Sequence, residues 1–197
     1  METLHTLGEQ LWNRIELSME MVEHRLRRTV RVLEQSGIPY AVVGGNAVRI
    51  WVAQVDQQAV RATNDVDILI RPADLDRLKQ AMLDAGFHYR RTMDVDMFVE
   101  NELESPRSAV HIVLSGQMVR SDDYESNPDV EPYQHGGDFR TLPLEKLVRM
   151  KLNSFRLKDK IHLLDMIQVG LIDADWCERF PDRLRQRLED LIENPNQ

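Results

Sequence analysis

Residues 42–47 read Val-Val-Gly-Gly-Asn-Ala and residues 63–70 read Thr-Asn-Asp-Val-Asp-Ile-Leu-Ile, and these two stretches decide the fold. The first is an apolar run closed by two glycines, which is typical of a strand that turns into a helix. In the second, Asp65 and Asp67 stand at alternate positions. Because alternate side chains of a strand point to the same face, both carboxylates are expected to project together. Adjacent carboxylates repel unless a cation lies between them, so this spacing indicates a site for Mg²⁺ or Mn²⁺, which suit hard oxygen ligands.

The glycine pair predicts an anion site beside the carboxylates. A Gly-Gly turn into a helix presents backbone N–H groups and the positive end of the helix dipole, with no Cβ in the way. Gly44, Gly45 and the amide of Asn46 are therefore candidates for binding phosphates. Thr63 either hydrogen-bonds a phosphate, orients the acidic pair or simply begins a strand. A lone Gly-Gly or Asp-x-Asp is usually unremarkable, but their ordered combination indicates a site for a nucleoside triphosphate.

Taken together, the two stretches resemble the signature of the polymerase-β-type nucleotidyltransferase superfamily. The threonine ahead of the acidic pair is similar to the toxin-like bacterial nucleotidyltransferases of the abortive-infection type. A second block supports this branch: Lys151, then Arg156-Leu157-Lys158-Asp159, then Asp165, resembles the helical pattern of those proteins. The resemblance covers roughly residues 38 to 170.

The resemblance implies an α/β (α+β) fold with a small mixed sheet, flanking helices and a C-terminal helical annex. It also implies that Lys151 contacts the triphosphate as a point charge, with Arg156 flanking it. Asp159 and Asp165 would accept hydrogen bonds from these cations or extend the active site. Lys158 matches the pattern, but we interpret it as a surface residue.

One position departs from the superfamily pattern. Where relatives carry a third acid between apolar residues, this chain has His111, in the run Ala-Val-His-Ile-Val of residues 109–113. Neutral imidazole is a poorer Mg²⁺ ligand than carboxylate, but it is suited to act as a general base near neutral pH. An ordinary core or edge histidine is the plain alternative. Asp94 and Asp96 also alternate, and they supply either the missing carboxylate or only an exposed strand face.

Apolar periodicity and Gly/Pro breaks divide the chain into an N-terminal helical segment (1–37), a nucleotidyltransferase core (38–142) and a C-terminal helical annex (143–197), packed as one unit. The expected elements are helices over 3–36, 46–55 and 72–83, strands over 40–43, 94–100, 109–114 and up to Ile70, an irregular segment over 115–142, and three helices between 144 and 191 with breaks at Gly170 and Pro181.

Composition narrows the class of protein. The net charge of −8 argues against a protein that coats nucleic acid, although the basic residues between 146 and 160 indicate a local basic cleft. No apolar stretch is long enough to span a membrane, and the N-terminus lacks a secretory signal, so cytoplasmic residence is expected. A single cysteine, Cys177, excludes an internal disulfide.

The sequence therefore predicts a metal-dependent nucleotidyltransferase that moves a nucleoside monophosphate from an NTP to an RNA end, a protein or a small alcohol. The catalytic candidates are Asp65, Asp67 and His111, and the metal ligands are the two aspartates. The alternative is a catalytically degenerate member that binds a nucleotide or a partner protein, as in a toxin-antitoxin system. An antitoxin-like module that docks through its N-terminal helix is a weaker third possibility. The oligomeric state is left open.

Overall fold

The computed structural model describes residues 2–120 and 123–195 and contains one mixed sheet in the order β3-β4-β5-β2-β1-β7-β6. The strands are β1 (Tyr40–Val43), β2 (Val66–Ile70), β3 (His88–Thr92), β4 (Val95–Val99), β5 (Val110–Leu114), β6 (Gln134–Gly136) and β7 (Phe139–Thr141). The α-helices are α1 (Glu2–Gln35), α2 (Gly44–Ala53), α3 (Leu75–Asp84), α4 (Leu144–Ser154), α5 (Leu157–Gln168) and α6 (Asp182–Glu193). This architecture confirms the predicted fold class.

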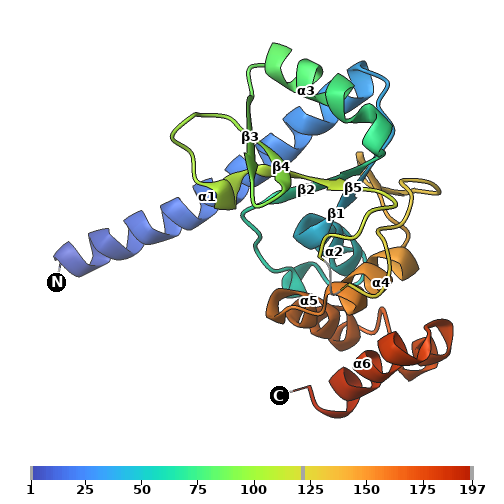
Figure 1. Ribbon diagram of the computed structural model, residues 1–197. Helices are drawn as coiled ribbons and strands as arrows, with labels where there is room; N and C mark the ends of the chain where they lie inside the picture. Colours follow the sequence, from blue (N-terminus) through green and yellow to red (C-terminus); the bar gives the residue numbers. More distant parts are fainter. Residues whose placement is uncertain (1, 121–122, 196–197) are drawn as a thin grey trace.

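Helices cover both faces of the sheet (Figure 1). The C-terminal half of α1 and helix α3 lie on one face, while α2, α4 and α5 lie on the other and α6 packs outside them. The N-terminal half of α1 extends beyond the rest of the molecule. Each face has its own apolar core, and the core of the α2 face continues without a break into α4, α5 and α6. The predicted annex therefore shares a core with the sheet.

Strand β2 carries the acidic motif through the middle of the sheet, antiparallel to β1 and parallel to β5. Val66, Ile68 and Ile70 are fully buried in the core beneath α1 and α3. Because strand side chains alternate, Asp67 points to the opposite face, where α2 and α5 pack. The period of the apolar residues thus fixes the face on which the carboxylates lie.

A sharp corner joins α4 to α5. Phe155 ends α4 in the left-handed region, with φ 45°, and Arg156 is the N-cap of α5. Asp159, in the first turn of α5, accepts hydrogen bonds from the backbone N–H of Arg156 at 3.3 Å and from its Nε at 2.8 Å. This corner turns the start of α5 toward the acidic motif.

Three strands were not expected from the sequence. Strand β3 is largely exposed and charged, so it lacks the apolar alternation that marks a strand, and β6 and β7 are only three residues long. Both short strands lie in the segment 115–142, which we expected to be irregular. Strand β7 adds to the sheet beside β1, with Thr141 paired to Val42. The expectation failed because these strands are defined by backbone pairing with adjacent strands of the sheet and not by local periodicity of their side chains.

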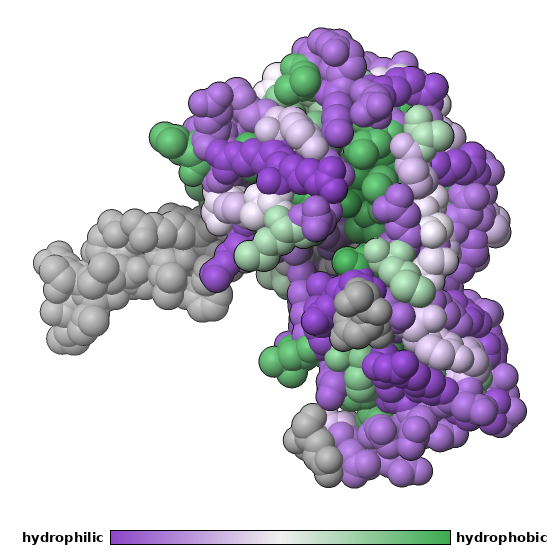
Figure 2. Space-filling view, viewed as in Figure 1, coloured by the Kyte–Doolittle hydropathy of each residue, from purple (hydrophilic) through white to green (hydrophobic). Residues whose placement is uncertain are grey.

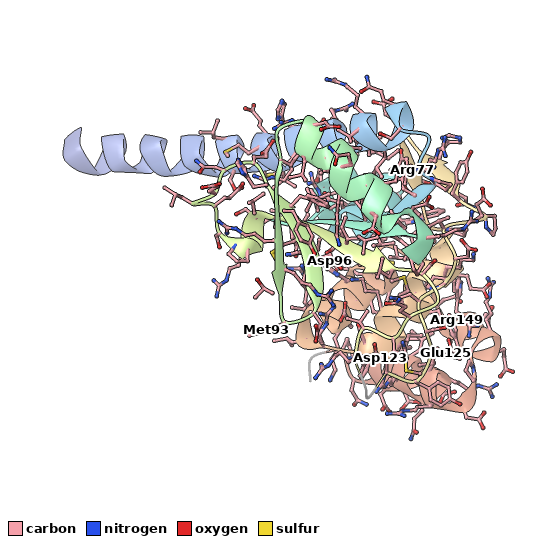
Figure 3. All side chains as sticks on the ribbon, turned by 45° about the horizontal axis from the view of Figure 1, so that its top comes forward. Arg77, Met93, Asp96, Asp123, Glu125 and Arg149 are labelled. Carbon is pink, nitrogen blue, oxygen red and sulfur yellow. The ribbon has the colours of Figure 1, made fainter. Side chains whose placement is uncertain are left out.

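The described part of the 115–142 segment is held against α4. The Asn153 Oδ1 accepts from the backbone N–H of Tyr124 at 2.8 Å and of Glu125 at 3.0 Å. The Glu125 carboxylate pairs with Arg149 at 3.2 Å, and these two side chains lie close together in Figure 3. Residues 121 and 122 lie outside the described residues.

The face of the molecule shown in Figure 2 is mostly hydrophilic, with hydrophobic side chains in small groups. Within the two described ranges of the chain, no helix combines the length and the apolar character needed to cross a membrane.

Candidate active site

The glycine turn and the acidic motif are in direct contact. Gly44 has φ +64°, and a Cβ at this position would lie 1.8 Å from Asp67 Oδ2. A Cβ on Gly45 would lie 2.7 Å from Thr63 Oγ1. The side-chain amide of Asn46 donates, through Nδ2, to the main-chain carbonyl of Asp65 at 2.8 Å. Helix α2 begins at Gly44, two residues earlier than the Asn46 expected from the sequence. Its first residues therefore contact the segment that carries the carboxylates.

Asp65 lies just before β2 and is held by two donors. Thr63 Oγ1 donates to its Oδ1 at 2.7 Å, and Lys158 Nζ donates to Oδ2 at 2.8 Å and to Oδ1 at 3.1 Å. Burial raises the pKa of Asp65, but the hydrogen bonds from Lys158 and Thr63 and the charge of Lys158 outweigh it and leave the pKa lowered. Asp65 is thus kept ionised.

His111 lies beside Asp67 on the neighbouring parallel strand. The two residues are register partners in β2 and β5, and His111 Nδ1 lies 3.4 Å from Asp67 Oδ1. The other ring nitrogen, Nε2, is 2.9 Å from the Pro106 carbonyl. Since a carbonyl only accepts, Nε2 carries a proton, and the neutral ring then turns the lone pair of Nδ1 toward a carboxylate. A second proton or a metal cation relieves this repulsion.

One ligand atom from each of Asp65, Asp67 and His111 lies within 4.8 Å of the other two. In the described residues this is the group that offers a metal ion three donors. The carboxylates are partly exposed, at 19% each, and the His111 side chain at 21%, so the donors are accessible from solvent. Two hard oxygen donors and an imidazole fit a divalent cation. The predicted position of His111, facing the acidic pair, agrees with this geometry.

The protonation of His111 gives a first testable expectation. The hydrogen bond with Asp67 raises the pKa of His111 above its ordinary 6.5, against the opposing effect of burial. A raised pKa in the folded state stabilises the fold fully below pH 6.5, and this contribution is lost as the pH rises through the folded pKa. NMR titration of the metal-free protein should show the raised pKa, and Asp67→Asn should return it toward 6.5. An unshifted His111 in the unmodified protein would contradict this expectation.

Two basic residues of the second motif, Lys151 and Arg156, form a separate ion-pair cluster around Asp159. Lys151, only 6% exposed, lies with its Nζ 2.9 Å from Asp159 Oδ1. Asp159 is fully buried and also accepts from Ser154 Oγ at 2.5 Å and from Arg156 Nε at 2.8 Å. Burial raises the pKa of Asp159, but Lys151, Arg156 and Ser154 outweigh it and hold the pKa well below its usual range. Lys151 therefore holds the α4–α5 corner in this state, and its predicted contact with a triphosphate stays a prediction.

Sequence reasoning missed three features of this region. Lys158, interpreted as a surface residue, is half-exposed but reaches Asp65. Arg61 Nε donates to both oxygens of Asp165, at 2.7 and 2.8 Å. Burial and the charges of Lys151 and Lys158 lower the pKa of His162 to about 4, so this side chain is neutral. The available signal was the alternation of Arg61 and Thr63 with the acidic pair, which places all four on one side of an extended chain.

Asp94 and Asp96, the other candidates for the third carboxylate, lie outside the group formed by Asp65, Asp67 and His111. Asp96 is 4% exposed and accepts a hydrogen bond from the Tyr89 hydroxyl, with Lys79 Nζ 3.9 Å away. The Asp94 side chain is 96% exposed in the turn between β3 and β4. Neither contributes to the metal-ligand group found in the described part of the chain.

Comparison with known proteins relates this chain to a protein family. A family model described as an uncharacterised nucleotidyltransferase matches residues 9–150. A search of curated protein sequences gave no match.

Two solved structures share the fold. One is the crystal structure of ANT(2″)-Ia in complex with adenylyl-2″-tobramycin, with 12% identity, coverage of 85% of this chain and 96% of that chain, and a TM-score of 0.55. The other is an antigenic nucleotidyltransferase-like protein from Paracoccidioides brasiliensis, with 15% identity, coverage of 88% of each chain and a TM-score of 0.50. At these identities the likeness concerns the fold.

Proposed function

Because this chain belongs to that nucleotidyltransferase family, we propose that it transfers a nucleoside monophosphate from a nucleoside triphosphate to an acceptor, with Mg²⁺ or Mn²⁺. The observation that carries the proposal is the contact between the Gly44 turn and Asp67, which brings a phosphate-binding helix start against a set of metal ligands. A degenerate protein that binds only a partner protein has no need to keep both parts in contact.

The side chains have distinct roles in this proposal. Asp65 and Asp67 hold the divalent cation, which when bound neutralises charge on the phosphates. The N–H groups at the start of α2 bind the outer phosphates and orient the α-phosphate for in-line attack. The acceptor oxygen then bonds to the α-phosphorus, the bond between the α- and β-phosphates breaks, and pyrophosphate leaves. His111 lies close enough to the acidic pair to take a proton from the acceptor hydroxyl, through Nδ1. Arg156 adds positive charge on the α5 side.

Replacement of both aspartates tests the metal site. Asp65→Asn with Asp67→Asn should abolish Mg²⁺-dependent binding of ATP, because neutral amides do not compensate the charge of the cation. Isothermal titration with and without Mg²⁺ measures the effect, and the thermal midpoint reports whether the fold is kept.

The matched control is Asp76→Asn with Asp94→Asn, which removes two exposed carboxylates that are not in the metal-ligand group. It should leave ATP binding unchanged. Unaltered Mg²⁺ dependence in the first double variant would overturn the assignment of the metal ligands.

The acceptor and the branch of the family belong to the same proposal. The motif around Thr63 and the block from Lys151 to Asp165 support the toxin-like branch. An RNA end and a protein hydroxyl are two candidate classes of acceptor. A small hydroxylated compound is the third class, and ANT(2″)-Ia was crystallised with an adenylylated aminoglycoside. Incubation with each labelled NTP and Mg²⁺ in cell extract should label one class, and the Asp65/Asp67 variant is the blank. Binding of nucleotide without any labelled product would favour the degenerate alternative.

A further inference from the structure

The Lys158 ammonium is paired with the Asp65 carboxylate, which a bound metal ion would need as a ligand. Its Nζ lies 2.8 Å from Asp65 Oδ2 and 3.1 Å from Oδ1, so one cation engages both oxygens. Thr63 donates to Oδ1 as well. A divalent ion that enters the site must therefore displace the ammonium from Asp65 or share the carboxylate with it.

The surrounding contacts leave Lys158 free to move. Two other cations lie near the α4–α5 corner: Lys151 in the last turn of α4 is buried against Asp159, and Arg156, the N-cap of α5, is bonded to the same carboxylate. The Lys158 side chain is 48% exposed and has Asp65 as its carboxylate partner. A lysine stem has several rotatable bonds and carries a compact charge, so the ammonium can change partners without moving the helix.

The phosphates of a bound nucleotide would lie within reach of this side chain. Asp65 is tied to Asn46 at the start of α2, where the phosphates are proposed to bind. An ammonium that leaves Asp65 therefore meets negative charge close by, in place of the carboxylate it loses.

We propose that Lys158 exchanges partners: it neutralises Asp65 in the metal-free protein and moves to the triphosphate when a cation takes its place on Asp65. This inference rests on the proposed function. It makes Lys158 a residue that couples the two ligands. The cation binds weakly alone, because it competes with the ammonium, and more tightly with the triphosphate, because the displaced ammonium gains a new partner. By linkage, the cation strengthens triphosphate binding by the same factor.

The test measures Mn²⁺ alone, ATP alone and Mn²⁺ with ATP in the unmodified protein and in Lys158→Gln. Electron paramagnetic resonance of free Mn²⁺ and isothermal titration give the dissociation constants without any need for catalysis. We expect Lys158→Gln to bind Mn²⁺ alone roughly three- to tenfold more tightly, because the competing cation is gone. We also expect Mn²⁺ and ATP to strengthen each other's binding by a smaller factor in Lys158→Gln. What remains is the direct attraction between the cation and the phosphates.

Lys160→Gln is the matched control, since it removes the same charge from the same helix. The Lys160 ammonium lies over the Phe155 ring, 4.7 Å from its centroid, and is not at Asp65. It should change the affinity for Mn²⁺ alone by less than Lys158→Gln does. Equal effects of the two variants, or an unchanged Mn²⁺ affinity in Lys158→Gln, would overturn the exchange and leave the proposed function standing. Absence of Mn²⁺–ATP binding in the unmodified protein would overturn the proposed function itself.

Discussion

Gly44→Ala should abolish Mg²⁺-dependent nucleotide binding and lower the free energy of unfolding by about 3 kcal/mol or more. Two penalties combine at this position. The left-handed φ of +64° costs an alanine about 1–2 kcal/mol. The new Cβ would also lie 1.8 Å from Asp67 Oδ2, so the carboxylate must move or the helix start must shift. Either change breaks the contact between the Gly44 turn and Asp67, on which the proposed nucleotide site depends.

Gly37→Ala separates these two penalties. Gly37 has φ +60°, but a Cβ there meets no atom within 4 Å. Its variant should lose only the backbone contribution, about 1–2 kcal/mol, and keep nucleotide binding. Urea unfolding and titration with Mg²⁺–ATP measure both quantities. Equal stability losses and equal binding in the two variants would show that Gly44 does not sit against Asp67.

Lys151→Met should lower the free energy of unfolding by about 3–5 kcal/mol, since it strips a fully buried carboxylate of its buried cation. Asp159→Asn in the same background should restore part of this loss, because the uncompensated charge is removed as well. Urea denaturation of the two single variants and the double variant closes the cycle. A coupling energy near zero would contradict the buried pair.

The acid dependence of this pair has a definite sign. A folded-state pKa that is held below the usual value contributes stability that is complete above the unfolded pKa of about 4 and is lost as the pH falls below it. The difference in stability between the unmodified protein and Lys151→Met should therefore shrink below pH 4. A constant difference down to strongly acid pH would point to lost packing as the cause.

Lys151→Met also tests the predicted contact between Lys151 and the phosphates. At low denaturant, where the variant is folded, a direct contact with the outer phosphates weakens ATP binding far more than AMP binding. Equal weakening of both nucleotides would assign Lys151 to the α4–α5 corner alone.

The sequence carried enough information to predict the centre of the fold. Apolar residues at alternate positions placed Asp65 and Asp67 on one side of the chain that enters β2, and the glycine pair marked the turn into α2, which begins at Gly44 and not at the expected Asn46. The apolar neighbours of His111 likewise placed the ring on the opposite side of its strand, and the resemblance to the superfamily implied that this side faces the acidic pair; the register of β2 and β5 sets it beside Asp67. These features follow from the period of a strand and from local backbone requirements, so they can be read from neighbouring residues.

The tertiary structure alone decided which cation meets which carboxylate. Lys151 and Lys158 are both lysines of the same motif, and nothing in their spacing distinguishes a buried partner of Asp159 from a half-exposed partner of Asp65. The corner at Phe155 and the packing of α5 against α2 make that choice. Strands β6 and β7 are a second case, because such short strands form only by pairing, β7 with β1 and β6 with β7. In both cases the deciding contacts join residues far apart in the chain, where sequence periodicity carries no information.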